Sequence, residues 1–294
     1  MLHFGNVITA MITPMHEDQS VNYEGAVKLA KYLAEHGSDG ILVAGTTGEG
    51  TTLTTEERQK LFTDVVKTVG DKVLVVANVG TNNTAQTVEF AKLAETTGVD
   101  ALLVIVPYYN KPNQDGCYAH FAAVAEATKL PILIYNVPGR TGGRILPETV
   151  VKLAKAYPNI VGIKEASGNL EAAAIIARDT PDHFYVYSGD DALTLPILSV
   201  GGQGVISVAS HLIGNEMNAL VQSYKDGNVK KAKELHHKYL PVMTGLFYTV
   251  NPTPVKACCN ILGLPAGPFR LPMVDATPEK KEFLKAMMKD AGVL

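Results

Sequence analysis

The sequence predicts a (β/α)8 barrel, the TIM-barrel class of α/β folds, followed by a C-terminal helical extension. Eight short apolar runs rich in β-branched residues recur at intervals of roughly 20 to 35 residues, about the length of one strand-plus-helix unit. Most runs are continuously apolar, as expected for parallel strands that are covered on both faces. The length of 294 residues suits one such barrel. Eight alternating units favour a closed barrel over an open doubly wound sheet.

The expected strands are the apolar runs at 7–12, 40–43, 72–77, 101–106, 132–135, 160–164, 184–187 and 204–207. The segments between them carry helix-start signals. Asn22 can cap a helix, Thr54 and Glu57 have the spacing of a capping box, and Pro147 suits a first helical turn. The helices expected from these and similar signals include 23–35, 55–69 and one from Thr84 to near Gly98.

No strand is expected after about Gly214. Helices are expected instead, with Pro- and Gly-rich connections between them. We therefore divide the chain into a catalytic barrel, residues 1–224, and a helical extension, residues 225–294. The helices expected in this part are 216–225, 229–243, 254–262 and 278–288.

The composition restricts the partners. A net charge of −3 argues against nucleic acid or an anionic membrane as the main partner. No segment approaches the roughly 18 apolar residues that a membrane span needs, and the first six residues lack the pattern of a signal peptide. The three cysteines are an odd count without the paired spacing of a zinc or redox site. We expect a cytoplasmic protein whose cysteines are reduced.

Lys164 is the strongest candidate for a reactive residue. It ends the apolar run 160–164, so its amine must lie in a pocket rather than in bulk water. Burial disfavours the charged form and lowers a lysine pKa, which makes the amine a nucleophile for carbonyl carbons. The alternative is a buried ion pair with Glu165 or Glu49. Schiff-base chemistry is the hypothesis that the other strand ends must support.

Several polar residues follow other predicted strands. The active site of a barrel lies at the carboxyl ends of its strands, where Thr46, Thr47, Tyr109, Tyr135 and Arg140 would join the lysine. Each has an alternative reading: the threonines could shape a loop, the tyrosines could only pack, and the arginine could be a solvated charge. Because all of them lie at the carboxyl-terminal face of the barrel, we favour the interpretation that they form a functional site.

The same strand ends lack the signals of other chemistries. They show no cluster of histidine and carboxylate residues that would bind a divalent metal. They also lack a Gly-x-Gly-x-x-Gly motif or a Walker loop. We expect no metal and no cofactor.

Six segments, taken in order, resemble the motifs of the dihydrodipicolinate synthase / N-acetylneuraminate lyase family, and the likeness covers essentially the whole chain. Arg140, within the run Val-Pro-Gly-Arg-Thr at 137–141, is similar to the synthase branch, whereas sugar-acid lyases generally lack this arginine. The resemblance implies condensation of pyruvate with aspartate 4-semialdehyde, the first committed step toward lysine and diaminopimelate. The matching segments are 45–49, 107–112, 135–142, 162–168, 188–191 and 201–207, with further likeness at 251–256 and 270–272.

The resemblance also implies catalytic roles. Lys164 would form the imine with pyruvate, and Tyr135 would shuttle protons through a relay with Thr46 and Tyr109. Tyr109 would reach the site of a neighbouring subunit, so a dimer would be the catalytic unit. The family assembly implied is a homotetramer, a dimer of dimers.

Substrate-binding roles follow from the same likeness. Thr47 would bind the pyruvate carboxylate, Arg140 the carboxylate of the semialdehyde, and Gly189 and Ile206 would line the pocket. Ordinary barrel packing is the alternative for Gly189 and Ile206.

Two competing functions remain open. One is a different pyruvate-dependent aldolase, acting on sialic acids or 2-keto-3-deoxy sugar acids, which Arg140 disfavours. The other is a barrel that binds a keto acid without turning it over, which the presence of the whole relay disfavours. This chain differs from the lysine-inhibited members of the family, which carry imidazole and acidic groups where this chain has Arg58 and Gln86. We therefore predict weak or absent inhibition by lysine.

Overall fold

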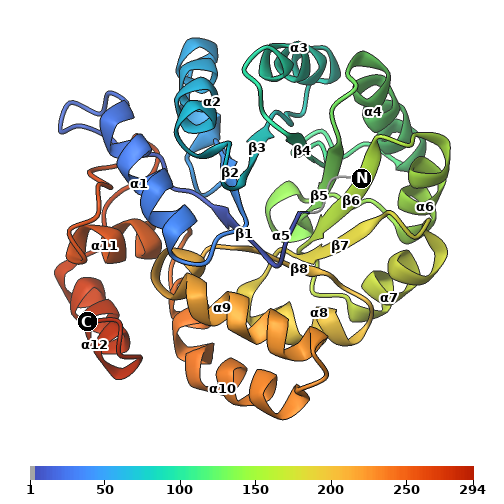
Figure 1. The fold of residues 1–294 in the computed structure, drawn as a ribbon. Helices are drawn as coiled ribbons and strands as arrows, with labels where there is room; N and C mark the ends of the chain where they lie inside the picture. The colour runs from blue at the N-terminus through green and yellow to red at the C-terminus, as the bar shows by residue number, and fades with distance from the viewer. Residues whose placement is uncertain (1–3) are drawn as a thin grey trace.

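Eight parallel strands close into a barrel in chain order in the computed structural model, which describes residues 4–294 (Figure 1). The predicted (β/α)8 TIM-barrel fold is confirmed. Within each strand, successive side chains alternate between the barrel interior and the surrounding helices. The strands are β1 (Val7–Ala10), β2 (Gly40–Val43), β3 (Leu74–Asn78), β4 (Ala101–Ile105), β5 (Ile132–Asn136), β6 (Ile160–Glu165), β7 (Tyr185–Ser188) and β8 (Gly204–Ser207).

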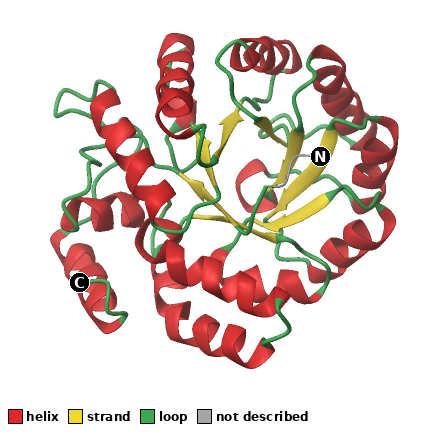
Figure 2. Ribbon diagram, in the orientation of Figure 1, coloured by secondary structure: helices red, strands yellow, loops and turns green. Residues whose placement is uncertain are grey.

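The outer ring consists of helices that follow the strands (Figure 2). The predicted caps are present: Asn22 accepts a bond from the Gly25 N–H, and Thr54 and Glu57 form a complete capping box. The ring helices are α1 (Tyr23–Glu35), α2 (Thr55–Val69), α3 (Thr84–Glu95), α4 (Gln114–Ala127), α6 (Pro147–Ala156), α7 (Leu170–Asp179), α8 (Thr194–Ser199) and α9 (Ser210–Lys225).

Three short elements interrupt the loops after the strands. They are η1 (Gly50–Thr52) after β2, α5 (Pro138–Thr141) after β5 and η2 (Asp191–Leu193) after β7. Each lies at the carboxyl end of its strand, the side of the barrel where the site was expected.

The chain continues beyond α9 through three more helices, α10 (Val229–Gly245), α11 (Thr253–Ile261) and α12 (Pro278–Asp290). Helix α10 packs against α9, and α11 and α12 pack against each other on the side of α1 (Figure 1). The expected helices of the C-terminal part are therefore present.

Several predicted boundaries differ from the observed ones, and two of the differences have a clear structural cause. The strand expected at 7–12 ends at Ala10, because the Ile12 N–H donates to Nε2 of His211 and no longer to a strand. The helix expected at 216–225 lies within α9, which starts earlier, at Ser210, because a further turn precedes the non-helical kink at Ile213.

Apolar packing forms two layers. Ile41 and Val43 of β2 face the helices, whereas Leu42 between them faces the barrel interior. The interior layer includes Tyr135, Tyr187 and other large side chains, so the barrel is filled rather than open. This interior packing forms the floor of the site.

Candidate active site

A cavity of about 360 Å³ opens at the carboxyl ends of the strands. The size suits small organic acids. Its walls combine an apolar floor with hydroxyl, amide and charged groups. The lining residues are Ala10, Leu42, Thr46, Thr47, Leu103, Tyr135, Val137, Gly139, Arg140, Lys164, Ala166, Gly189, Asp190, Val208, Phe247 and Asn251.

Lys164 lies at the base of this cavity, near the end of β6. The strand register sets it beside Tyr135 of β5 and Tyr187 of β7. Its Nζ is 4.5 Å from the centre of the Tyr135 ring, and only 6% of the residue is exposed. The pKa of Lys164 is lowered to about 8, chiefly by burial; Asp191 opposes this shift and Arg140 adds to it.

Neither carboxylate proposed as an ion-pair partner binds this lysine. Glu49 instead pairs with Lys256 at 2.6 Å. Glu165 accepts bonds from the Asn136 side chain and the Ser167 N–H. The ion pairs found within residues 4–294 all involve other cations. Lys164 is therefore a desolvated amine that faces open space.

Gly189 provides room for the lysine. A Cβ at this position would lie 2.7 Å from the Ala166 Cβ, 3.0 Å from Cγ of Lys164 and 3.2 Å from its Cε. Any larger residue would therefore push against the lysine side chain.

Tyr135 and Thr46 form a hydroxyl pair beside the amine. Burial raises the pKa of the Tyr135 phenol, while Arg140 and a hydrogen bond with Thr46 act in the opposite direction. A phenol in this state is protonated at neutral pH, so it can pass a proton only in exchange for another.

Thr47 and Arg140 occupy different depths of the cavity. Thr47 is buried, and its Oγ1 accepts a 3.0 Å bond from Nδ2 of Asn251. Arg140 is exposed on α5 at the cavity mouth. An anionic group can therefore meet a hydroxyl deep in the cavity and a guanidinium at its entrance.

A comparison with known protein families matches the chain to one of them. The model of the dihydrodipicolinate synthetase family matches residues 3–291 of the chain. The chain belongs to this family.

Family relatives and solved structures agree with that match. The 4-hydroxy-tetrahydrodipicolinate synthase of Listeria innocua is 53% identical over 290 residues, covering 98% of this chain and 99% of the relative. The enzyme of the same name from Moorella thermoacetica is 50% identical, covering 100% of both chains. A dihydrodipicolinate synthase structure from Cyanidioschyzon merolae with lysine bound is 49% identical, has a TM-score of 0.97 and covers 99% of both chains.

The structure brings together most of the residues selected from the sequence. Lys164, Tyr135, Thr46, Thr47, Arg140 and Gly189 all line the one cavity. Tyr109 does not: it is 87% exposed on the loop after β4, with a positive φ of 71°. Ile206 lies within the interior layer beneath the cavity and is 1% exposed.

Sequence reasoning did not single out two polar residues at or near this cavity. Asn251 belongs to a family-like segment, but nothing local in the sequence places it 3.0 Å from Thr47. Asp191 is buried beside the cavity-lining Asp190, and its carboxylate accepts bonds from the Ser207 hydroxyl and from the N–H groups of Val208 and Ala209. Burial nevertheless raises the pKa of Asp191. Its position after a strand was the available signal.

Within residues 4–294, no group of three or more His, Cys, Asp or Glu side chains is arranged to hold a metal. Over the same residues, no helix combines the length and the apolar character needed to cross a membrane. Cys117, Cys258 and Cys259 are buried free thiols.

Proposed function

We propose that this chain condenses pyruvate with L-aspartate 4-semialdehyde to give 4-hydroxy-tetrahydrodipicolinate, as a lyase of lysine and diaminopimelate biosynthesis. The observation that carries the proposal is Lys164, a buried amine without a carboxylate partner, at the base of a cavity lined by hydroxyl groups. The synthase names of the full-length relatives support it.

The reaction would begin on the Lys164 amine. The amine adds to the pyruvate ketone, and loss of water gives a protonated imine. The imine withdraws electrons, so the methyl group loses a proton and an enamine forms. The enamine carbon then bonds to the aldehyde carbon of the second substrate. Attack of that substrate's own amino group on the imine carbon closes the ring and frees the lysine.

Proton transfers in these steps fall to the hydroxyl pair. Tyr135 lies against Lys164 and hydrogen-bonds with Thr46, so it can receive a proton while giving one up. Thr47 would bind the pyruvate carboxylate, and Arg140 would bind the carboxylate of the semialdehyde as it enters. Gly189 would leave the imine its space, and Ile206 would support the floor.

The relay also requires Tyr109, which we propose acts in the site of a neighbouring subunit. Its outward position and positive φ suit a side chain presented to another molecule. We propose a homotetramer built from two such dimers. A solved relative at 40% identity is described as a monomeric variant, so the assembly must be measured. Analytical ultracentrifugation of the wild type and Tyr109→Phe would do so.

We also propose that residues 1–224 act as the catalytic barrel and residues 225–294 as an extension, in a cytoplasmic protein that needs no cofactor or metal. The helices after α9 support this division. Arg140 at the cavity mouth disfavours a sugar-acid lyase, whose second substrate is a polyol.

Borohydride trapping tests the function. Incubation with pyruvate and borohydride should leave a reduced pyruvate adduct on the Lys164 peptide, detected by mass spectrometry, and Lys164→Ala should show none. Consumption of the semialdehyde, compared with N-acetylmannosamine, then identifies the second substrate. A folded wild-type protein without an adduct would refute the mechanism.

A further inference from the structure

We propose that Asn251 is a positioning residue for the keto acid: its amide fixes the Thr47 hydroxyl so that the hydroxyl proton points to the substrate carboxylate. The inference rests on the proposed function, and it assigns part of the site to the C-terminal extension. Asn251 lies between α10 and α11, far from the barrel loops in sequence.

The two side chains meet at the cavity wall. Nδ2 of Asn251 is 3.0 Å from Oγ1 of Thr47, and both residues are buried and line the cavity. Residues 204 positions apart therefore share one buried bond. Because this bond is shielded from water, its direction constrains the hydroxyl more than a surface bond would.

The number of protons on each group fixes the direction of this hydrogen bond. An amide nitrogen can only donate, so Thr47 Oγ1 must be the acceptor. A hydroxyl has a single proton and two acceptor sites, so the proton of Thr47 stays available for another acceptor. A carboxylate accepts hydrogen bonds only, and bonds from donors to an ionised group are the stronger class. With Asn251 donating to its oxygen, the Thr47 hydroxyl can therefore donate its proton to an anion.

The other end of the amide points to the same role. Oδ1 of Asn251 is buried and has no hydrogen-bond partner. A buried amide that serves only the architecture normally has both ends partnered, because an unpartnered buried polar atom is destabilising. Here the end that is partnered is the one that faces Thr47. Asn251 therefore serves the hydroxyl rather than the packing of its own segment.

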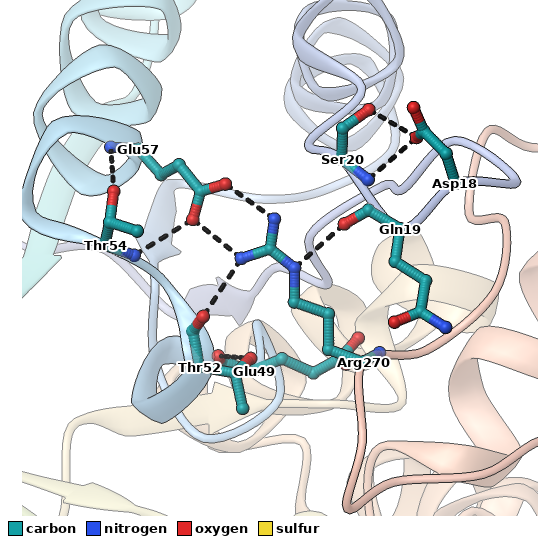
Figure 3. Close-up of polar contacts among 8 residues, drawn as sticks. All are labelled: Asp18, Gln19, Ser20, Glu49, Thr52, Thr54, Glu57 and Arg270. Atoms are coloured by element: carbon teal, nitrogen blue, oxygen red, sulfur yellow. Dashed lines mark hydrogen bonds and ion pairs between the residues drawn. The ribbon is translucent and has the colours of Figure 1, made fainter.

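Two further contacts hold the same two segments together. Lys256 pairs with Glu49 at 2.6 Å, and the Arg270 N–H donates to the other Glu49 oxygen at 3.0 Å. Figure 3 shows the Arg270 guanidinium between the start of α2 and the loop before α1, where it bonds to both carboxylate oxygens of Glu57 and to the carbonyls of Thr52 and Gln19. Two residues that follow Asn251 in the chain, Lys256 and Arg270, thus also hold the loop that carries Thr47.

The consequence is selectivity for a ketone that bears a carboxylate. If Asn251 orients the proton, its loss should weaken imine formation with pyruvate but leave a neutral ketone largely unaffected. Methyl pyruvate is the matched probe, since it keeps the ketone and replaces the anion with an ester. A residue that merely supports the fold would change both probes equally.

The experiment measures half-saturating concentrations for borohydride-trapped adduct formation with pyruvate and with methyl pyruvate, without the second substrate. The variants are Asn251→Leu, which removes the donor at similar volume, Asn251→Asp, which can only accept when ionised, Thr47→Val, and the double variant Asn251→Leu/Thr47→Val. Asn260→Asp is the control, because Asn260 is exposed on α11 and its amide bonds only to the Gly267 backbone.

We expect Asn251→Leu and Thr47→Val each to raise the value for pyruvate about tenfold, with less than a twofold change for methyl pyruvate. The double variant should resemble either single variant, because both remove the same interaction. Asn251→Asp should have the largest effect, and the Asn260→Asp control should match the wild type.

Equal effects on both probes, or additive effects in the double variant, would overturn the positioning role. An effect of Asn251→Asp without one of Asn251→Leu would show simple charge repulsion and would also overturn it. If Asn251→Asp does not fold, Asn251→Leu and the double variant still decide. Absence of any adduct in the wild type would instead refute the proposed function.

Discussion

Lys164 and Lys256 are both buried, yet the protein treats their charges in opposite ways. Lys256 is 0% exposed, pairs with Glu49 at 2.6 Å and lies over the Phe269 ring. Lys164 lies over the Tyr135 ring at a similar distance but has no carboxylate in contact and faces a cavity.

The difference shows what makes a buried lysine reactive. Burial lowers the pKa of both amines, but for Lys256 the charge and hydrogen bond of Glu49 act against this shift. A paired ammonium has no free lone pair and serves the structure. An unpaired amine keeps its lone pair for a substrate carbonyl. The predictions below test this contrast, beginning with the largest expected effect.

Replacing each lysine by methionine should separate chemistry from structure. Lys164→Met should lower turnover roughly a thousandfold or more, since no other group can form the imine. Lys256→Met should still give the pyruvate adduct on Lys164 wherever the protein is folded. Steady-state assays and mass spectrometry after borohydride treatment measure both. Adduct formation in folded Lys164→Met would break the contrast.

The same two variants should shift stability in opposite directions. Lys256→Met leaves Glu49 buried and unpaired, which should lower the free energy of unfolding by about 3–5 kcal/mol. Lys164 binds a proton less readily when folded than when unfolded, because its folded pKa is about 8 against 10.5. It therefore costs up to about 3 kcal/mol at pH 7, below both values, and this cost fades as pH rises from about 8 to 10.5.

Urea unfolding at pH 7 measures this difference. Lys164→Met should be as stable as the wild type or more so, whereas Lys256→Met should unfold at clearly lower urea. Glu49→Gln/Lys256→Met, which removes both charges, should recover part of the loss. Equal destabilisation by both single lysine variants would show that Lys164 has a compensating partner after all.

The pH dependence of imine formation sharpens the contrast further. The free amine is the nucleophile, so the trapping rate should rise with pH, with its midpoint near the Lys164 pKa of about 8. Arg140 lowers this pKa. Arg140→Gln should therefore move the midpoint upward and slow trapping below pH 8, by less than about tenfold. Lys152→Gln, a charge loss on α6, is the control and should leave the midpoint unchanged. A midpoint near 10 in the wild type would contradict the lowered pKa.

The fold and much of the site could be predicted because their signals are local. Apolar strands and helix caps are encoded by residues that are close together in the sequence. Lys164 was recognisable as a charged residue at the end of such a strand. The partner of each buried charge could not be predicted. Whether Glu49 pairs with Lys164 or Lys256 depends on how the C-terminal helices dock. Asn251 was missed for the same reason, since its contact with Thr47 is purely tertiary.

Arg58 offers a third way to bury a cation, and it predicts the smallest effect. Its guanidinium donates to the carbonyls of Gly50 and Asn78 and stacks 4.8 Å over the Phe90 ring, without a carboxylate. Burial lowers its pKa, but an arginine remains charged at neutral pH. The positive charge therefore stays beside η1, where a lysine ammonium would be repelled.

Free L-lysine should consequently inhibit this chain less than twofold at millimolar concentration. The relative from Cyanidioschyzon merolae has been solved with lysine bound, so it serves as the positive control. Steady-state rates at fixed substrate, with and without lysine, measure the effect, and calorimetry detects binding without inhibition. Strong inhibition at low lysine concentration would mean that Arg58 moves aside. A cation held by carbonyl groups and an aromatic ring can then be displaced, unlike Lys256, which has a carboxylate partner.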